Sequence, residues 1–69
     1  MMEGKLLARW ETRQGKGWYE LYRNSDGGFS YRGDDSGGVL SCHTLEDAVG
    51  RMVGKMIRDG RRFHWTGGE

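Results

Sequence analysis

The chain has 69 residues, of which 11 are Lys or Arg and 10 are Asp or Glu, so its formal net charge is +1. Chains divide into separate domains only above about 250 residues, so the sequence predicts a single small α+β domain over residues 1–69. A net charge this weak argues against a disordered chain. It also argues against the long-range positive field typical of proteins that bind nucleic acid or acidic membranes.

The first half of the chain alternates apolar and polar side chains with the period of two that is typical of half-buried strands. Residues 6–13 predict a first strand, and residues 14–17 predict the turn that follows it. Residues 18–23 predict an aromatic-rich second strand, which ends in the strong turn signal of residues 24–28. Residues 29–32 predict a short third strand.

The second half begins with a polar loop over residues 33–38 and continues with a helix over residues 44–60. Between them, residues 39–42 are either a fourth short strand or an extension of the third. After the helix, residues 63–66 can add a short C-terminal edge strand. The prediction is therefore an α+β fold, in which an antiparallel sheet of three to four strands carries one amphipathic helix on one face.

The helix signal has three consistent parts. Thr44 is suited to the N-cap, with acidic Glu46 and Asp47 in the first turn. Gly60 follows as a left-handed stop. Seven apolar residues fall on one helical stripe, namely Leu45, Ala48, Val49, Met52, Val53, Met56 and Ile57. We expect this stripe to cover the sheet and aromatic residues of the strands to join the core.

The second strand also carries the strongest binding signal. If Tyr19 and Leu21 face the core, then Trp18 and Tyr22 face solvent, and in the other register Tyr19 is outside. Large aromatics are exposed in either register, beside arginines of the neighbouring strands, and this composition is typical of protein interfaces and of base-stacking surfaces. The competing interpretation is a plain solvent-facing surface. The candidate partner-binding residues are Arg9, Arg13, Trp18, Tyr22 and Arg32.

A basic patch is predicted on the helix side opposite the apolar stripe. Its residues are Arg51, Lys55, Arg58, Arg61 and Arg62. This patch is either a solvated face that complements the helix dipole or a surface that follows phosphates. Gly50 and Gly54 each cost about 1 kcal/mol relative to Ala in a helix. They indicate contact with a partner or a second copy, close packing inside the monomer, or neutral variation.

No active site is predicted. Cys42 and His43 are neighbours, and neighbouring residues on a strand point to opposite faces. Adding His64 gives three metal-ligating side chains without the paired spacing of a zinc site. We therefore expect a protein that is not an enzyme and has no metal or cofactor. A single cysteine and the lack of a long apolar run favour a cytoplasmic protein outside the membrane.

The order of elements resembles the three-strand-plus-helix domains of AP2-type and phage integrase arm-binding proteins. The resemblance runs loosely from Arg9 to Arg58 and rests on residues 18–21, residues 28–31 and the segment Thr44 to Ala48, which is similar to that family's T-x-E-E-A. It implies that the outer side of the sheet enters the DNA major groove through the five candidate residues. In size and in lacking an active site, the chain also resembles small phage and mobile-element inhibitors, including anti-CRISPR proteins.

Two function classes follow from these observations. The first is a non-enzymatic inhibitor or adaptor, such as an inhibitor of a bacterial defence system, that binds a protein partner and can form a homodimer. The second is a nucleic-acid-binding domain that uses the same sheet face or the basic helix. The mixed charge of the sheet face favours the first class.

Overall fold

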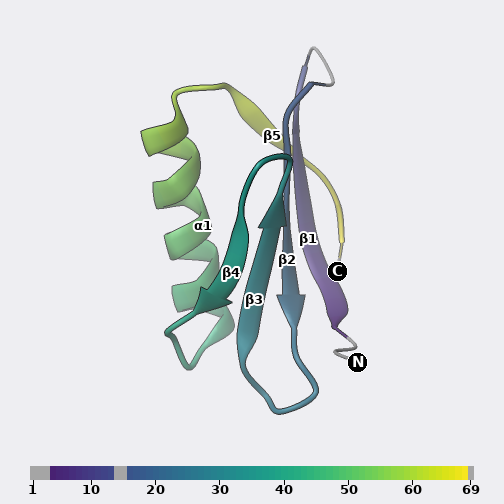
Figure 1. The fold of residues 1–69 in the computed structure, drawn as a ribbon, viewed down its shortest axis with the longest axis vertical. Helices are drawn as coiled ribbons and strands as arrows, with labels where there is room; N and C mark the ends of the chain where they lie inside the picture. Colours follow the sequence, from purple (N-terminus) through teal and green to yellow (C-terminus); the bar gives the residue numbers. More distant parts are fainter. Residues whose placement is uncertain (1–3, 14–15, 69) are drawn as a thin grey trace.

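Four strands precede a single helix, and a fifth strand follows it (Figure 1). The computed structural model describes residues 4–13 and 16–68. The elements are β1 (Lys5–Thr12), β2 (Trp18–Arg23), β3 (Phe29–Gly33), β4 (Gly37–Leu40), α1 (Leu45–Asp59) and β5 (Phe63–Gly68). All strands belong to one antiparallel sheet in the order β4-β3-β2-β1-β5. The predicted α+β class, with one sheet and one helix, is confirmed.

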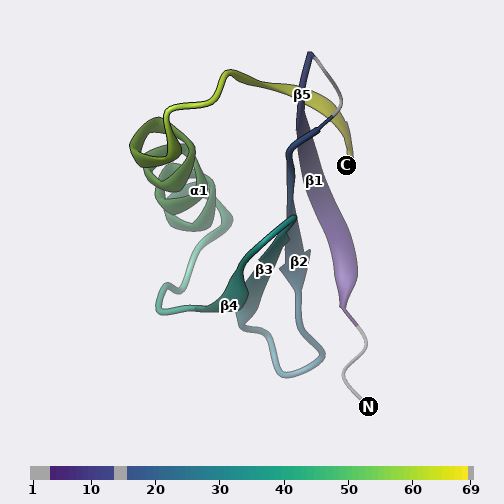
Figure 2. The same ribbon diagram turned by 45° about the horizontal axis from the view of Figure 1, so that its top comes forward.

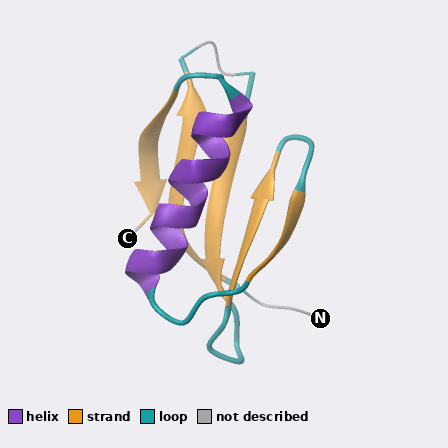
Figure 3. Cartoon of the chain, turned by 90° about the vertical axis from the view of Figure 1, so that its left-hand side faces the viewer, coloured by secondary structure: helices purple, strands orange, loops and turns teal. Residues whose placement is uncertain are grey.

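The sheet has five strands, where three to four and a short C-terminal addition were expected. The last strand extends to Gly68, beyond the predicted residues 63–66, and pairs with β1. Because β4 and β5 lie at opposite edges of the sheet, α1 crosses the face between them (Figure 3). Figure 2 shows that α1 lies on one side of the sheet only, so the other side is covered by no described element.

The hairpin of β3 and β4 differs from its expected boundaries. β3 continues to Gly33, and β4 spans Gly37–Leu40, so residues 41–42 are not part of a strand. The glycines were expected in the loop because glycine is depleted in strands. In the fold, however, a Cβ added at Gly38 would lie 3.5 Å from the ring of Tyr31. The pairing of Tyr31 with Gly38 and of Arg32 with Gly37 extends the strand into this glycine-rich segment despite its low strand propensity.

The helix begins and ends where its signals predict. The Oγ1 atom of Thr44 accepts a hydrogen bond from the backbone N–H of Asp47 at 3.1 Å. Gly60 has φ 88°, and its N–H donates to the carbonyl of Met56 at 3.2 Å. In the described part of the chain, no helix combines the length and apolar character needed to cross a bilayer.

The core lies between α1 and the inner face of the sheet. Its buried apolar residues are Leu7, Ala8, Trp10, Tyr19, Leu21, Phe29, Leu40, Ala48, Met52 and Met56. A register shift between Leu6 and Ala8 makes β1 irregular at this point, where the consecutive residues Leu7 and Ala8 are both buried. Aromatic residues supply much of this core, as expected for a chain with few aliphatic side chains.

The helix stripe is only partly buried, which corrects the expectation that all of it covers the sheet. Its central line, formed by Ala48, Met52 and Met56, is buried, but Val53 is 42% exposed and Ile57 is 74% exposed. Leu45 is exposed as well. The cause is width, because five strands span about 19 Å and one helix is only about 10–12 Å across. Both flanks of α1 are therefore left open.

Candidate binding surfaces

The side of the sheet opposite α1 carries most of the candidate partner-binding residues. Cross-strand pairs share a face, and the pairs Arg9 with Glu20 and Glu20 with Arg32 form one row across three strands. We call this side the outer face, and its residues are Leu6, Arg9, Glu11, Trp18, Glu20, Tyr22, Ser30, Arg32, Val39 and His64. Tyr19 and Leu21 are buried on the inner face, so the structure has the first of the two registers that the sequence left open.

Polar side chains of the outer face hold one another in place. The Nε of Arg9 donates to Glu11 at 2.7 Å, and another nitrogen of the same guanidinium donates to Glu20. The hydroxyl of Tyr22 also donates to Glu20. The guanidinium carbon of Arg9 lies 5.1 Å from the ring centre of Trp18, within cation–π range. Glu20 is thus the centre of a network that orders two candidate residues directly and Trp18 through Arg9.

The network also shifts two pKa values. The hydrogen bond to Glu11 raises the pKa of Arg9 above its ordinary value. The hydrogen bond to Glu20 and partial burial raise the pKa of Tyr22, while Arg32 opposes that rise. Both groups are protonated donors at neutral pH even at their ordinary pKa values, and these shifts move their titration further from it.

The charges of the outer face cancel. Two arginines, Arg9 and Arg32, are matched by two glutamates, Glu11 and Glu20. Arg32 is exposed, whereas Trp18 and Tyr22 are half-buried among their neighbours. The result is a mixed-charge aromatic surface without net charge.

Arg13 lies just after β1, apart from this network. It lines a hollow of about 370 Å³ together with Thr12, Lys16, Arg61 and Arg62. The structure therefore groups Arg13 with part of the predicted basic patch, while the other four partner-binding candidates share the outer face.

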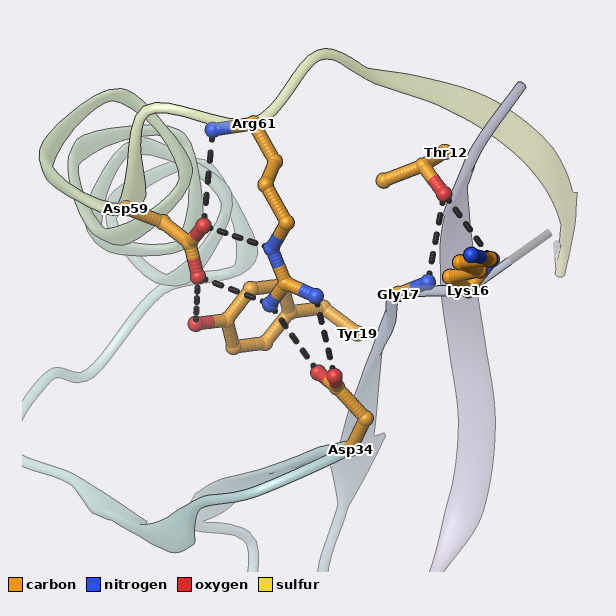
Figure 4. A network of polar contacts seen from close by, with 7 residues as sticks. All are labelled: Thr12, Lys16, Gly17, Tyr19, Asp34, Asp59 and Arg61. Atoms are coloured by element: carbon orange, nitrogen blue, oxygen red, sulfur yellow. Dashed lines mark hydrogen bonds and ion pairs between the residues drawn. The ribbon is translucent and has the colours of Figure 1, made fainter. Parts of the chain in front are cut away.

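Arg61 is a structural residue that joins three parts of the fold (Figure 4). Its guanidinium donates to Asp59 at 2.7 and 2.9 Å and to Asp34 at 2.9 and 3.1 Å. The hydroxyl of Tyr19 donates to Asp59 at 3.2 Å. Gly17 makes room for Arg61, since a Cβ there would lie 2.2 Å from its Nη1. The guanidinium lowers the pKa of Asp34 and lowers that of Asp59 to about 2.

The predicted basic patch is therefore divided. Arg51, Lys55 and Arg58 line a groove on the flank of α1 that faces β4. Arg61 and Arg62 follow the end of α1 at Asp59 and line the hollow with Arg13 instead. Their place in the helical periodicity is lost because the helix stops at Gly60.

The helix glycines are not explained by packing within the monomer. A Cβ added at Gly50 or Gly54 would find no atom of the described chain within 4 Å. Close packing inside the monomer is therefore the wrong explanation for either glycine. Contact with a partner or a second copy stays a prediction.

The other flank of α1 carries an apolar surface that the sequence did not single out. A groove of about 310 Å³ is lined there by Trp10, Val53, Met56, Ile57, Arg61 and Phe63. Trp65, which pairs with Trp10 across β1 and β5, is 60% exposed. The alternation of residues 63–66 was a usable signal, because it places both large aromatics of β5 on the face that α1 covers only in part.

Among residues 4–13 and 16–68, no three His, Cys, Asp or Glu side chains come close enough to hold a metal ion. Cys42 is a half-buried free thiol, and His43 is exposed. Comparison with family models, curated proteins and solved structures finds no match to this chain.

Proposed function

We propose that this chain is a non-enzymatic binding protein that contacts a partner protein through the outer face, as an inhibitor or adaptor does. The observation that carries the proposal is the network of Arg9, Glu20 and Tyr22 beside Trp18, on a face that no described element covers. An inhibitor of a bacterial defence system is the form of this function that the small size of the chain favours.

The composition of the outer face is that of an interface centre. Trp, Tyr and Arg supply most of the binding energy at protein interfaces, and the outer face has Trp18, Tyr22 and two arginines within three adjacent strands. Ordering a free side chain on binding costs about 0.5–1.5 kcal/mol. Arg9 and Tyr22 are already held by Glu20, so much of that cost is met by folding.

The electrostatics of this face favour a protein over a nucleic acid. Phosphate recognition depends on Lys and Arg side chains that are free to neutralise phosphate charge. Arg9 is instead bound to Glu11 and Glu20, and carboxylates on the surface repel phosphates. A protein partner with its own mixed charges meets this surface without that penalty.

The test is affinity capture with matched tryptophan variants. Wild type, Trp18→Ala and Trp65→Ala would be immobilised and exposed to bacterial lysate with and without nuclease treatment, and the retained proteins would be identified by mass spectrometry. Trp65 is the control, because it is an exposed tryptophan on the other side of the sheet. Thermal unfolding followed by circular dichroism would verify that each variant is folded.

We expect proteins that wild type and Trp65→Ala retain and that Trp18→Ala loses by about tenfold or more, the cost of one central interface residue. The same proteins recovered by all three chains would contradict the proposal. Capture that disappears with nuclease treatment would instead support the nucleic-acid alternative.

A further inference from the structure

A groove of about 390 Å³ separates α1 from the edge strand β4. In Figure 1 β4 is the strand drawn nearest to α1, and Figure 3 shows α1 crossing in front of the sheet. The groove residues are Val39, Leu40, Ser41, Arg51, Gly54, Lys55 and Arg58. The groove shares Val39 with the outer face, and the function proposed above does not use that residue.

The helix wall of the groove is positively charged. Arg51, Lys55 and Arg58 make no ion pair with any residue in the described ranges. The Nζ of Lys55 lies 4.4 Å from the ring centre of Tyr31, which steadies the ammonium without neutralising it. None of the described residues that line the groove is Asp or Glu. The wall is therefore complementary to carboxylates.

The strand wall offers backbone groups. β4 is the last strand of the sheet, so one of its edges has no partner strand. Natural edge strands often carry charged side chains or proline, which prevent pairing with a further strand. β4 has neither, because it consists of Gly37, Gly38, Val39 and Leu40. Val39 is 77% exposed. This edge is open to an added strand.

Gly54 keeps the groove clear on the helix side. No described atom lies within 4 Å of the position of its missing Cβ, and glycine at a helix interior costs about 1 kcal/mol relative to Ala. The wall of the groove is therefore open beside Gly54.

The cations of α1 and the side chains of an added strand have comparable spacings. Along α1, successive cations at positions 51, 55 and 58 rise by about 6 and 4.5 Å. Side chains on one face of an extended strand recur about every 6.7 Å. Over two steps the strand is longer by about 3 Å. The long, flexible Arg and Lys side chains span this difference, so alternate acidic residues of a strand beside β4 reach successive cations of the helix.

We propose that this groove binds an extended acidic segment of a partner protein, which pairs with β4 as an additional strand and directs alternate carboxylates to Arg51, Lys55 and Arg58. Strand addition of this kind draws affinity from main-chain hydrogen bonds and specificity from alternate side chains. A nucleic acid fits less well, because its backbone has no N–H groups to pair with the carbonyls of β4.

The test uses a fluorescein-labelled peptide of alternating Glu and Val, about eight residues long, the length of an ordinary strand. Its binding is measured by fluorescence anisotropy at low salt. Two further peptides carry N-methyl groups, one on the odd-numbered amides and the other on the even-numbered amides. Each peptide lacks the N–H donors along one edge of the strand and keeps all of its carboxylates. A single-stranded oligonucleotide of equal charge is the competing ligand.

We expect the unmodified peptide to bind and one of the two N-methylated peptides to bind at least about tenfold more weakly, since a strand pairs along one edge only. The double variant Arg51→Glu/Arg58→Glu is expected to lose about tenfold in affinity, and the exposed Arg62→Glu outside the groove is expected to keep it. Trp18→Ala should bind the peptide like wild type, so the result for the groove does not depend on whether the outer face binds a partner.

The proposal is overturned if the unmodified peptide does not bind, or if both N-methylated peptides bind as well as it does. Equal or tighter binding of the oligonucleotide would assign the groove to nucleic acid instead. The peptide series decides the matter even if a charge-reversed variant fails to fold.

Discussion

Arg61 and Asp34 are 27 positions apart in the chain, yet their side chains meet in a two-point ion pair with N–O distances of 2.9 and 3.1 Å. Asp34 lies between β3 and β4, and Arg61 is also bound to Asp59, the last residue of α1. The guanidinium therefore ties the end of the helix to the loop of the β3–β4 hairpin. α1 and β4 also form the two walls of the groove lined by Arg51, Lys55 and Arg58, so the ion pair links the end of one wall to the loop that precedes the other.

The first prediction concerns the coupling between Arg61 and Asp34. Arg61→Ala and Asp34→Ala should each lower Tm, and the double variant should lose less than the sum of the two, because residues in direct contact are not additive. Thermal unfolding of the four proteins measures this coupling. Arg62→Ala, an exposed neighbour outside the ion pair, is the control and should leave Tm unchanged. Strict additivity would show that the ion pair is not formed in solution.

The second prediction concerns acid. The guanidinium of Arg61 lowers the pKa of Asp59 from 3.8 to about 2, so the folded state binds this proton less readily than the unfolded state. The stabilisation is complete above the unfolded pKa and is lost as pH falls from about 4 toward 2. Urea unfolding of wild type and Asp59→Asn should give a stability difference that is constant above pH 5 and shrinks toward pH 2. A difference that does not change with pH would contradict the assignment.

Local signals explain why the helix could be predicted so closely. The Thr44 cap, the spacing of the stripe and the stop at Gly60 all act within a few residues, and each is present in the fold. Arg61 shows the limit of such signals. It was predicted as an extension of the basic patch on the helix, but it comes after the stop, and its partner Asp34 is brought close only by the complete sheet.

The sequence predicted the arginines and large aromatics of the outer face, but it did not determine which side of the second strand faces the core. Tyr19 and Tyr22 are equally apolar, so alternation alone cannot say which of them faces the core. The helix decides the question, because α1 buries Leu21 and leaves Trp18 on the opposite side. The open flanks of α1 follow from the relative widths of a helix and five strands, and the strand count depends on β5 pairing with β1, a contact between the two ends of the chain.

The third prediction compares two glycines. Gly17→Ala should destabilise the fold, because the new Cβ would lie 2.2 Å from Nη1 of Arg61 and displace the guanidinium from its carboxylates. Gly54→Ala should stabilise it by about 0.5–1 kcal/mol, because the site is open and alanine is the better helix former. Urea unfolding measures both changes. If Gly17→Ala were as stable as wild type, the Arg61 side chain could adopt another conformation without loss of stability, and its close approach to Gly17 would not be needed for the fold.

The fourth prediction concerns the half-buried stripe of α1. Met52 is fully buried and Ile57 is 74% exposed, although both belong to the same apolar stripe. Met52→Ala should cost about 2–5 kcal/mol through loss of contacts and the cavity left behind. Ile57→Ala should change stability by no more than about 0.5 kcal/mol, as at other exposed positions. Unfolding free energies at several protein concentrations test both values, because a cost at Ile57 that grows with concentration would mean that a second copy of the chain covers this flank of the helix.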